Sequence, residues 1–340
     1  MRGLLIASVL VSLSLVSFNY SQAACVEGPV DTFTCNNSAP NPDPTGVQQF
    51  GNNNNLTVNV LPGAAIDTSF AGGGNGGDAI ELSDGADTVT VDNGTVIGED
   101  DGIETRFLND TVKVTDSTII GSTTPGDAIE TSRGDDYIEV VNSTLTGADD
   151  GITSAQDNDT VKIHNSTVTG NDDGVELQAG NDNLMVTSST ITSINSNGIT
   201  CAQGNDIVMI EDSTVNGFSD SINGGSGNDV ITFKTGANMT NLIRCGSDFD
   251  TLVFAMEVPE DLVLFISSQI NAANPAGDSL EINGLTYTWE DCELLVSEVV
   301  GVPIVPRPVP TLSEWGLIAM AGAMGLFGIF FVVRRQRAAV

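Results

Sequence analysis

The chain has 340 residues, of which 45 are acidic and 11 are basic, and its net charge is −34. This charge excludes nucleic acid as a partner and favours cationic partners. Glycine occurs 37 times and aromatic residues make up only 5% of the chain, so the composition favours a turn-rich, all-β protein over a helical bundle, although 40% of the residues are apolar.

The N-terminus has the pattern of a secretion signal. Arg2 precedes an apolar run over residues 4–16, and residues 21–23 supply the small side chains of a signal-peptidase site. We therefore expect residues 1–23 to be a signal peptide that is cleaved after Ala23.

Export would place the five cysteines in an oxidising compartment. Cys25 and Cys35 are ten residues apart, and outside the cytoplasm we expect this pair to form a disulfide, with two free thiols as the alternative. Cys245 and Cys292 are placed to link the end of the repeats, described next, to the region that follows. That pairing leaves Cys201 as a buried free thiol.

An internal repeat dominates the middle of the chain. An aspartate recurs every 21–26 residues, and an aliphatic residue stands seven positions before each one. Because the aspartate and the aliphatic residue recur with the same irregular spacing, each period is one structural unit. The aspartates are Asp87, Asp110, Asp136, Asp159, Asp182, Asp206, Asp229 and Asp250.

Each period contains three short pieces with alternating apolar residues, separated by Gly, Asn and Asp. In one unit these pieces lie around Ile152, Val161 and Val168. Three strands and three turns in about 23 residues describe one triangular coil of a parallel β-helix. We expect eight to nine coils over residues 56–254, after an N-terminal cap at residues 24–55.

The alternation also predicts which side chains face solvent. Stacked aliphatic columns form the core, and one column of threonines faces outward, where β-branched hydroxyl residues suit a solvated strand face. The threonines are Thr95, Thr118, Thr144, Thr167, Thr190 and Thr214.

The repeat resembles the right-handed, single-stranded parallel β-helix of pectate-lyase-like and adhesin-like secreted proteins. The resemblance rests on the DGI, GND-like and NSTI-like segments of the periods. It implies the fold but leaves the activity open, because this architecture carries lyases, hydrolases, adhesins and passive surface proteins.

Stacking turns each repeated acidic residue into a ladder. A second acidic ladder stands two positions before the aliphatic residue, and a weaker column of glutamates follows it. Carboxylates about 4.8 Å apart repel each other by roughly 1 kcal/mol in water. Ca²⁺, hydrogen bonds from Gly and Asn turn amides, or protonation of alternate members would each relieve this repulsion. The second ladder is Asp78, Asp101, Asp127, Asp150, Asp173, Asn197 and Asp220, and the glutamates are Glu81, Glu104, Glu130 and Glu176.

One turn favours calcium. The segment 224–231, GGSGNDVI, resembles the GGxGxDxU nonapeptide of calcium-binding RTX proteins, which repeat it in tandem, whereas it occurs once here. The resemblance implies Asp229, with Asp206 in the adjacent coil, as candidate calcium ligands. No other cofactor is expected.

A catalytic site on this scaffold should break the repeat with unmatched groups. Arg106 and Arg133 do so at nearby coil positions, as a uronate lyase would need for its base and for charge neutralisation. His164 is isolated and, by alternation, points outward. The sequence therefore disfavours catalysis; if the protein is a polysaccharide lyase or a glycoside hydrolase, Arg106 and Arg133 are its candidate catalytic residues.

The repeats give way to a different C-terminal region. The sequence pattern predicts an amphipathic helix over residues 259–271 and a hairpin over residues 280–289, with its turn around Gly284. Together, residues 255–300 predict a cap for the open end of the coils. The proline-rich stretch 301–310 predicts a stiff, extended linker.

The apolar segment 317–333 is uncharged and just long enough to cross a bilayer. Arg334, Arg335 and Arg337 follow it and set its C-terminal end inside the cytoplasm. We expect a single transmembrane helix that holds the rod outside the membrane. Simple anchoring already accounts for these features.

Residues 309–340 also resemble the IPTL-type C-terminal sorting signal of Gram-negative bacteria. The resemblance implies processing near Pro310 and Thr311 by an exosortase, a membrane transpeptidase, in a bacterium that makes exopolysaccharide. The motif residues would be recognised by that enzyme and would not be catalysts. They are Val309, which stands for Ile, with Pro310, Thr311, Leu312, Trp315 and Gly316.

The sequence thus predicts an exported, acidic β-helix at the cell envelope or in the extracellular matrix, with a structural or adhesive role. The expected partners are an exosortase and the membrane, with a polysaccharide or a cell-surface ligand as further candidates. A polysaccharide-active enzyme and a calcium-binding matrix protein remain the alternatives.

Overall fold

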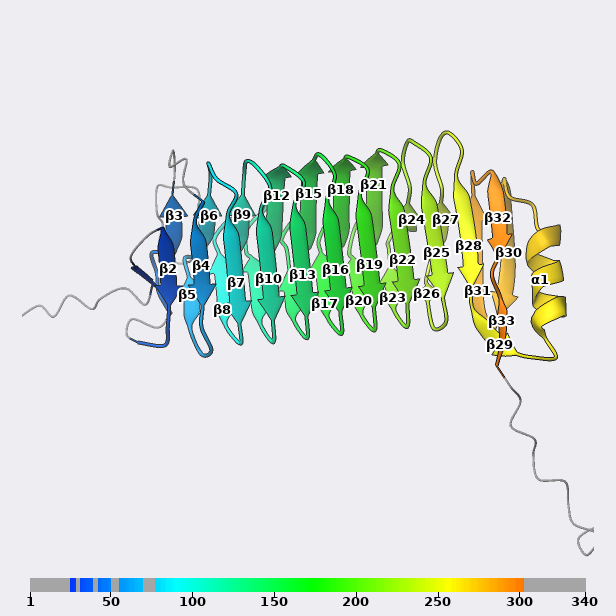
Figure 1. Ribbon diagram of the computed structural model, residues 1–340, viewed down its shortest axis with the longest axis horizontal. Helices are drawn as coiled ribbons and strands as arrows, with labels where there is room; N and C mark the ends of the chain where they lie inside the picture. Colours follow the sequence, from blue (N-terminus) through cyan, green and yellow to red (C-terminus); the bar gives the residue numbers. More distant parts are fainter. Residues whose placement is uncertain (1–24, 29–30, 39–41, 50–54, 70–76, 303–340) are drawn as a thin grey trace, which may run out of the picture.

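The computed structural model describes residues 25–28, 31–38, 42–49, 55–69 and 77–302. These residues wind into one rod, a parallel β-helix of about nine turns (Figure 1). Three long sheets, named A, B and C here, run along the rod and give each coil three sides. The all-β parallel fold expected from the repeat is confirmed.

Sheet A contains twelve of the described strands, in spatial order from the N-terminal end. They are β1 (Cys25–Glu27), β2 (Thr32–Cys35), β4 (Thr57–Val60), β7 (Thr88–Asp92), β10 (Thr111–Thr115), β13 (Tyr137–Val141), β16 (Thr160–His164), β19 (Asn183–Thr187), β22 (Ile207–Glu211), β25 (Val230–Lys234), β28 (Thr251–Ala255) and β32 (Leu294–Ser297).

Sheet B contains eight described strands and sheet C eleven. Sheet B consists of β5 (Ala65–Asp67), β8 (Thr95–Gly98), β11 (Thr118–Gly121), β14 (Thr144–Thr146), β17 (Thr167–Gly170), β20 (Thr190–Ser193), β23 (Thr214–Asn216) and β26 (Asn238–Met239). Sheet C consists of β3 (Val47–Gln49), β6 (Ile80–Leu82), β9 (Ile103–Thr105), β12 (Ile129–Arg133), β15 (Ile152–Gln156), β18 (Val175–Ala179), β21 (Ile199–Gln203), β24 (Asp220–Asn223), β27 (Leu242–Arg244), β31 (Leu285–Glu290) and β30 (Gly277–Ile282).

The core is a stack of aliphatic columns, because equivalent residues of successive coils pair directly. Val161 in β16 pairs with Ile138 in β13, and both side chains are fully buried. Lys162, between the buried Val161 and Ile163, projects outward. The period-2 alternation of each short strand therefore decides which side chains enter the rod.

The parallel ladders extend beyond residues 56–254 at both ends. At the N-terminal end, β2 pairs with β4 and β3 with β6; at the C-terminal end, β31 pairs with β27 and β32 with β28, all in parallel. Asp31 directly before β2 and Glu293 directly before β32 stand where the inner coils have an aspartate, so the ladder position also continues into the terminal coils.

The C-terminal end is closed by a helix and a hairpin. Helix α1 (Val263–Ala272) lies across the end of the rod in Figure 1 and buries Ile266 and Ile270. The expected hairpin forms from the antiparallel strands β30 and β31. The helix begins four residues later than expected. Residues Glu257–Pro259 form strand β29, which pairs with β33 (Val300–Val302), so Pro259 belongs to a strand and not to the helix.

Two disulfides join Cys25 to Cys35 and Cys245 to Cys292, as expected, and Cys201 is free and buried. Within the described part of the chain, no helix has the length and apolar character needed to cross a bilayer. The signal peptide expected at residues 1–23 and the span expected at residues 317–333 lie outside the described residues.

Candidate functional site

The acidic ladders hold adjacent coils together through backbone amides. We call the eight aspartates from Asp87 to Asp250 the A-ladder, because each precedes or begins a coil's sheet A strand. In it, Asp159 accepts a hydrogen bond from the amide of Asp136 in the preceding coil at 2.7 Å. The whole A-ladder repeats this contact at 2.7–2.8 Å, from the amide of Leu56 on Asp87 to the amide of Asp229 on Asp250.

In the other ladder the hydrogen bonds run in the opposite direction along the rod, from the following coil. We call Asp78, Asp101, Asp127, Asp150, Asp173, Asn197 and Asp220 the C-ladder, since they introduce sheet C. Asp127 accepts from the amide of Asp150 in the following coil at 2.8 Å. The contacts along the C-ladder measure 2.6–3.1 Å.

Amide hydrogen bonds to the ladders are thus confirmed, but the expected donors were wrong. One of the three explanations that the sequence left open used Gly and Asn turn amides, whereas the donors are chiefly aspartate amides of the adjacent coil. In-register parallel stacking places each carboxylate beside the equivalent amide one coil away, where no strand partner is available for it.

Burial shifts the titration of the A-ladder. Six of its members have a second carboxylate oxygen that is buried without a hydrogen-bond partner: Asp110, Asp136, Asp182, Asp206, Asp229 and Asp250. Desolvation, helped by neighbouring carboxylates, raises the pKa of Asp110 to about 8 and those of Asp136 and Asp182 to about 7. Part of the ladder therefore holds protons at neutral pH.

Asp206 and Asp229, the calcium ligands expected from the sequence, belong to this buried ladder. One carboxylate oxygen of each accepts a backbone amide at 2.8 Å, and both side chains are about 1% exposed. Neither belongs to a described group of three acidic side chains with ligand atoms within 4.8 Å of one another.

Such groups lie instead along the C-ladder and near its turns. They are Asp78 with Asp101 and Glu104, Asp101 with Asp127 and Glu130, and Asp149 with Asp150 and Asp172. Burial, opposed by amide hydrogen bonds and reinforced by neighbouring carboxylates, raises the pKa of Asp101 to about 9. The sequence showed these columns, but the side-chain distances that bring three members together were not predicted.

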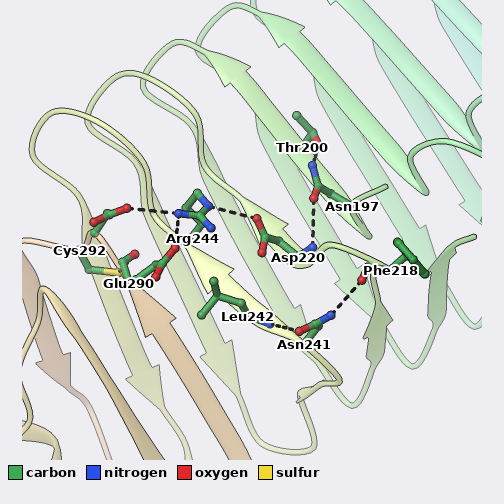
Figure 2. Close-up of polar contacts among 10 residues, drawn as sticks. Asn197, Thr200, Phe218, Asp220, Asn241, Leu242, Arg244, Glu290 and Cys292 are labelled. Atoms are coloured by element: carbon green, nitrogen blue, oxygen red, sulfur yellow. Dashed lines mark hydrogen bonds and ion pairs between the residues drawn. The ribbon is translucent and has the colours of Figure 1, made fainter. Parts of the chain in front are cut away.

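Arginine side chains pair with carboxylates at both ends of the C-ladder. Near its start, Arg106 contacts Glu81 at 2.6 Å and Glu104 at 2.7 Å, and Glu81 is only 1% exposed. At its far end, Figure 2 shows Asp220 between Asn197 and Arg244, whose Nε lies 3.2 Å from the Asp220 carboxylate. Arg244 also pairs with Glu290 beside the Cys245–Cys292 disulfide, which ties the ladder to the C-terminal hairpin.

The structure brings Arg106 and Arg133 together in one groove of about 410 Å³. The Arg133 guanidinium lies over the ring of Phe107 at 5.4 Å, and Ser132 and Gln156 add polar groups. Arg106 is already paired with two carboxylates. His164 lies apart, exposed beside a pocket of about 150 Å³.

Comparison with known proteins bears on the end of the chain. Residues 307–337 match the IPTL-CTERM motif. This motif is a sorting signal that an exosortase-type enzyme processes, and it implies an exported protein. It contains all six sorting residues expected from the sequence, from Val309 to Gly316, which lie outside the described residues. No curated protein and no solved structure matches the chain.

The buried ladders predict that the rod is most stable in mild acid. Folded-state pKa values of about 6 to 9 lie above the value of 3.8 for an ordinary aspartate, so the folded chain binds more protons than the unfolded chain between these limits. The resulting stabilisation is complete below about pH 4 and is lost as the pH rises through the folded values. After removal of divalent cations, we expect calorimetry to show the unfolding temperature falling by about 5 °C or more from pH 5 to pH 8.

The matched variant is Asp182→Asn, which keeps the oxygen that accepts the Asp159 amide and removes a titrating group. Its unfolding temperature should fall less between pH 5 and pH 8 than that of the unchanged protein. An unfolding temperature of the unchanged protein that stays level or rises over this range would contradict the account of the ladders.

Proposed function

We propose that the protein is an exported rod that an exosortase processes near Pro310 and Thr311, and that acts as a structural or adhesive element at the cell envelope or in the matrix. The observation that carries the proposal is the sorting motif at residues 307–337, behind a β-helix of about nine turns. A long, regular rod held by one end suits display on a surface better than it suits enclosure of a small substrate.

The domain organisation that we propose follows from this role. Residues 1–23 direct export and are removed after Ala23. Residues 301–310 separate the rod from the sorting signal at 309–340. The apolar segment 317–333 holds the precursor in the membrane until processing.

Substitution of the motif tests this proposal. The Pro310→Ala/Thr311→Ala double variant of the full chain should keep its C-terminal tail and accumulate in the membrane fraction of an exosortase-bearing host. The measurement is the intact mass of the protein from each cell fraction. Val309→Ile is the control, because it restores the usual first residue of the motif and should be processed normally. The same mass and fraction for the unchanged protein and the double variant would favour simple anchoring.

Calcium binding is a second candidate function, and the group around Asp78 favours it. Oxygens of Asp78, Asp101 and Glu104 lie within 4.8 Å of one another, about twice the usual Ca²⁺–oxygen distance of roughly 2.4 Å. Glu81 adds a fourth carboxylate, and Arg106 supplies a single positive charge to the four. Asp206 and Asp229 remain the alternative pair that the sequence suggested.

Equilibrium dialysis with Ca²⁺ at pH 7.5 separates these sites. Asp78→Asn removes a charge but keeps an oxygen for the Asp101 amide, as Asn197 does in the same ladder, and it should weaken binding at least about tenfold. Asp173→Asn is the control, because Asp173 belongs to none of the three groups. Loss of binding in Asp206→Asn alone would place the ion in the A-ladder, and no saturable binding by the unchanged protein would reject this function.

A polysaccharide-active enzyme is the weaker alternative. That Arg106 and Arg133 line one groove supports this alternative, but Arg106 is already paired with Glu81 and Glu104. A carboxylate held in an ion pair is a poor general base. The net charge of −34 also opposes the approach of an acidic polysaccharide substrate.

A further inference from the structure

The outer face of sheet B is a regular two-column array. In β14 the outward residues are Thr144 and Thr146, with Leu145 fully buried between them. The parallel register sets Thr167 beside Thr144 and Thr169 beside Thr146. Both columns continue across neighbouring strands. The first is Thr95, Thr118, Thr144, Thr167, Thr190 and Thr214, and the second is Ile97, Ile120, Thr146, Thr169, Thr192 and Asn216.

This face lacks charge in a protein whose net charge is −34. From β8 to β26, all of which the structure describes, no outward residue of sheet B is acidic or basic. Sheet A differs, since the same coils place Lys113, Glu139 and Lys162 on its outer face. An uncharged partner therefore suits sheet B and does not suit sheet A.

A hydrogen-bonded serine ladder fixes the spacing of the array. A serine stands directly before most of the threonines, and Ser166 accepts the amide of Ser143 in the preceding coil at 3.0 Å. The Ser166 hydroxyl donates in turn to the carbonyl of His164 at 2.7 Å. The same contacts recur from Ser117 to Ser189, and the strands of sheet B start in register along the rod.

The array has two fixed repeats. Strands stack at about 4.8 Å, and alternate residues of a parallel strand lie about 6.6 Å apart. A flexible partner loses conformational entropy when it binds such a lattice, whereas a crystalline surface is already ordered and can contact many threonines at once. Threonine offers a hydroxyl that binds water and a methyl group that restricts how the bound water orients. Crystalline glycans are the poorer match, because sheet B presents no aromatic ring for sugars to stack on.

We propose that the outer face of sheet B binds the surface of ice through its column of six threonines and the three threonines beside it, Thr146, Thr169 and Thr192. The proposal rests on the adhesive role above and names the partner. Water held by the threonines at these regular intervals would merge with the crystal, and many weak contacts would then add along the rigid rod. A result against ice binding would leave the export and sorting of the rod untouched, because those depend on residues 307–337.

Partitioning of the purified protein into a slowly growing ice hemisphere tests the inference. We expect the unchanged protein to be incorporated and an ice-inert protein of similar size to be excluded. Thr167→Tyr, at an exposed position in the middle of the array, should lower incorporation at least about fivefold by lifting the ice away from its neighbours. Thr167→Val tests the hydroxyl alone and should lower incorporation less.

Thr160→Tyr is the matched control, because Thr160 begins β16 of the same coil but lies on sheet A. It should be incorporated like the unchanged protein, and circular dichroism should give all variants the same spectrum. Exclusion of the unchanged protein from ice would overturn the proposal. So would equal losses in Thr167→Tyr and Thr160→Tyr, or adsorption to crystalline cellulose or chitin without adsorption to ice.

Discussion

The hydrogen bond from a turn amide to the aspartate of an adjacent coil is the interaction on which this rod depends. Strand pairing satisfies the backbone within the sheets, but at the turns each coil exposes amides that pairing does not reach. The A-ladder accepts them from the preceding coil and the C-ladder from the following coil. Coils are thus joined in both directions, with one or two such contacts per coil.

The same arrangement concentrates negative charge in a dry environment. A carboxylate that is buried to reach an amide leaves its second oxygen without a partner, as in Asp136 and Asp182. Protonation of some carboxylates neutralises part of this negative charge. At the two ends of the C-ladder, Arg106 and Arg244 neutralise a further part. The middle of that ladder relies on amides, protons or bound cations, which links the stability of the rod to the ionic conditions outside the cell.

Much of the fold follows from the sequence because in-register stacking converts a period in the chain into a column in space. The aspartates, the buried aliphatic residues and the outward threonines all occupy the positions that the repeat predicts. The terminal coils were harder to predict, since Leu56 interrupts the aspartate column after Asp31 and Glu293 replaces the aspartate before β32. The pairing of Arg106 with Glu81 and Glu104, and the donors to the ladders, depend on side-chain distances that a period does not specify.

Hydrogen exchange at the amide of Asp159 tests the central interaction most directly. This amide lies in a turn but donates to the Asp182 carboxylate at 2.8 Å. We expect it to exchange as slowly as the neighbouring strand amides, to remain protected in Asp182→Asn, and to lose protection in Asp182→Ala. Exchange of the Asp159 amide in the unchanged protein at the rate of an unstructured peptide would contradict the account.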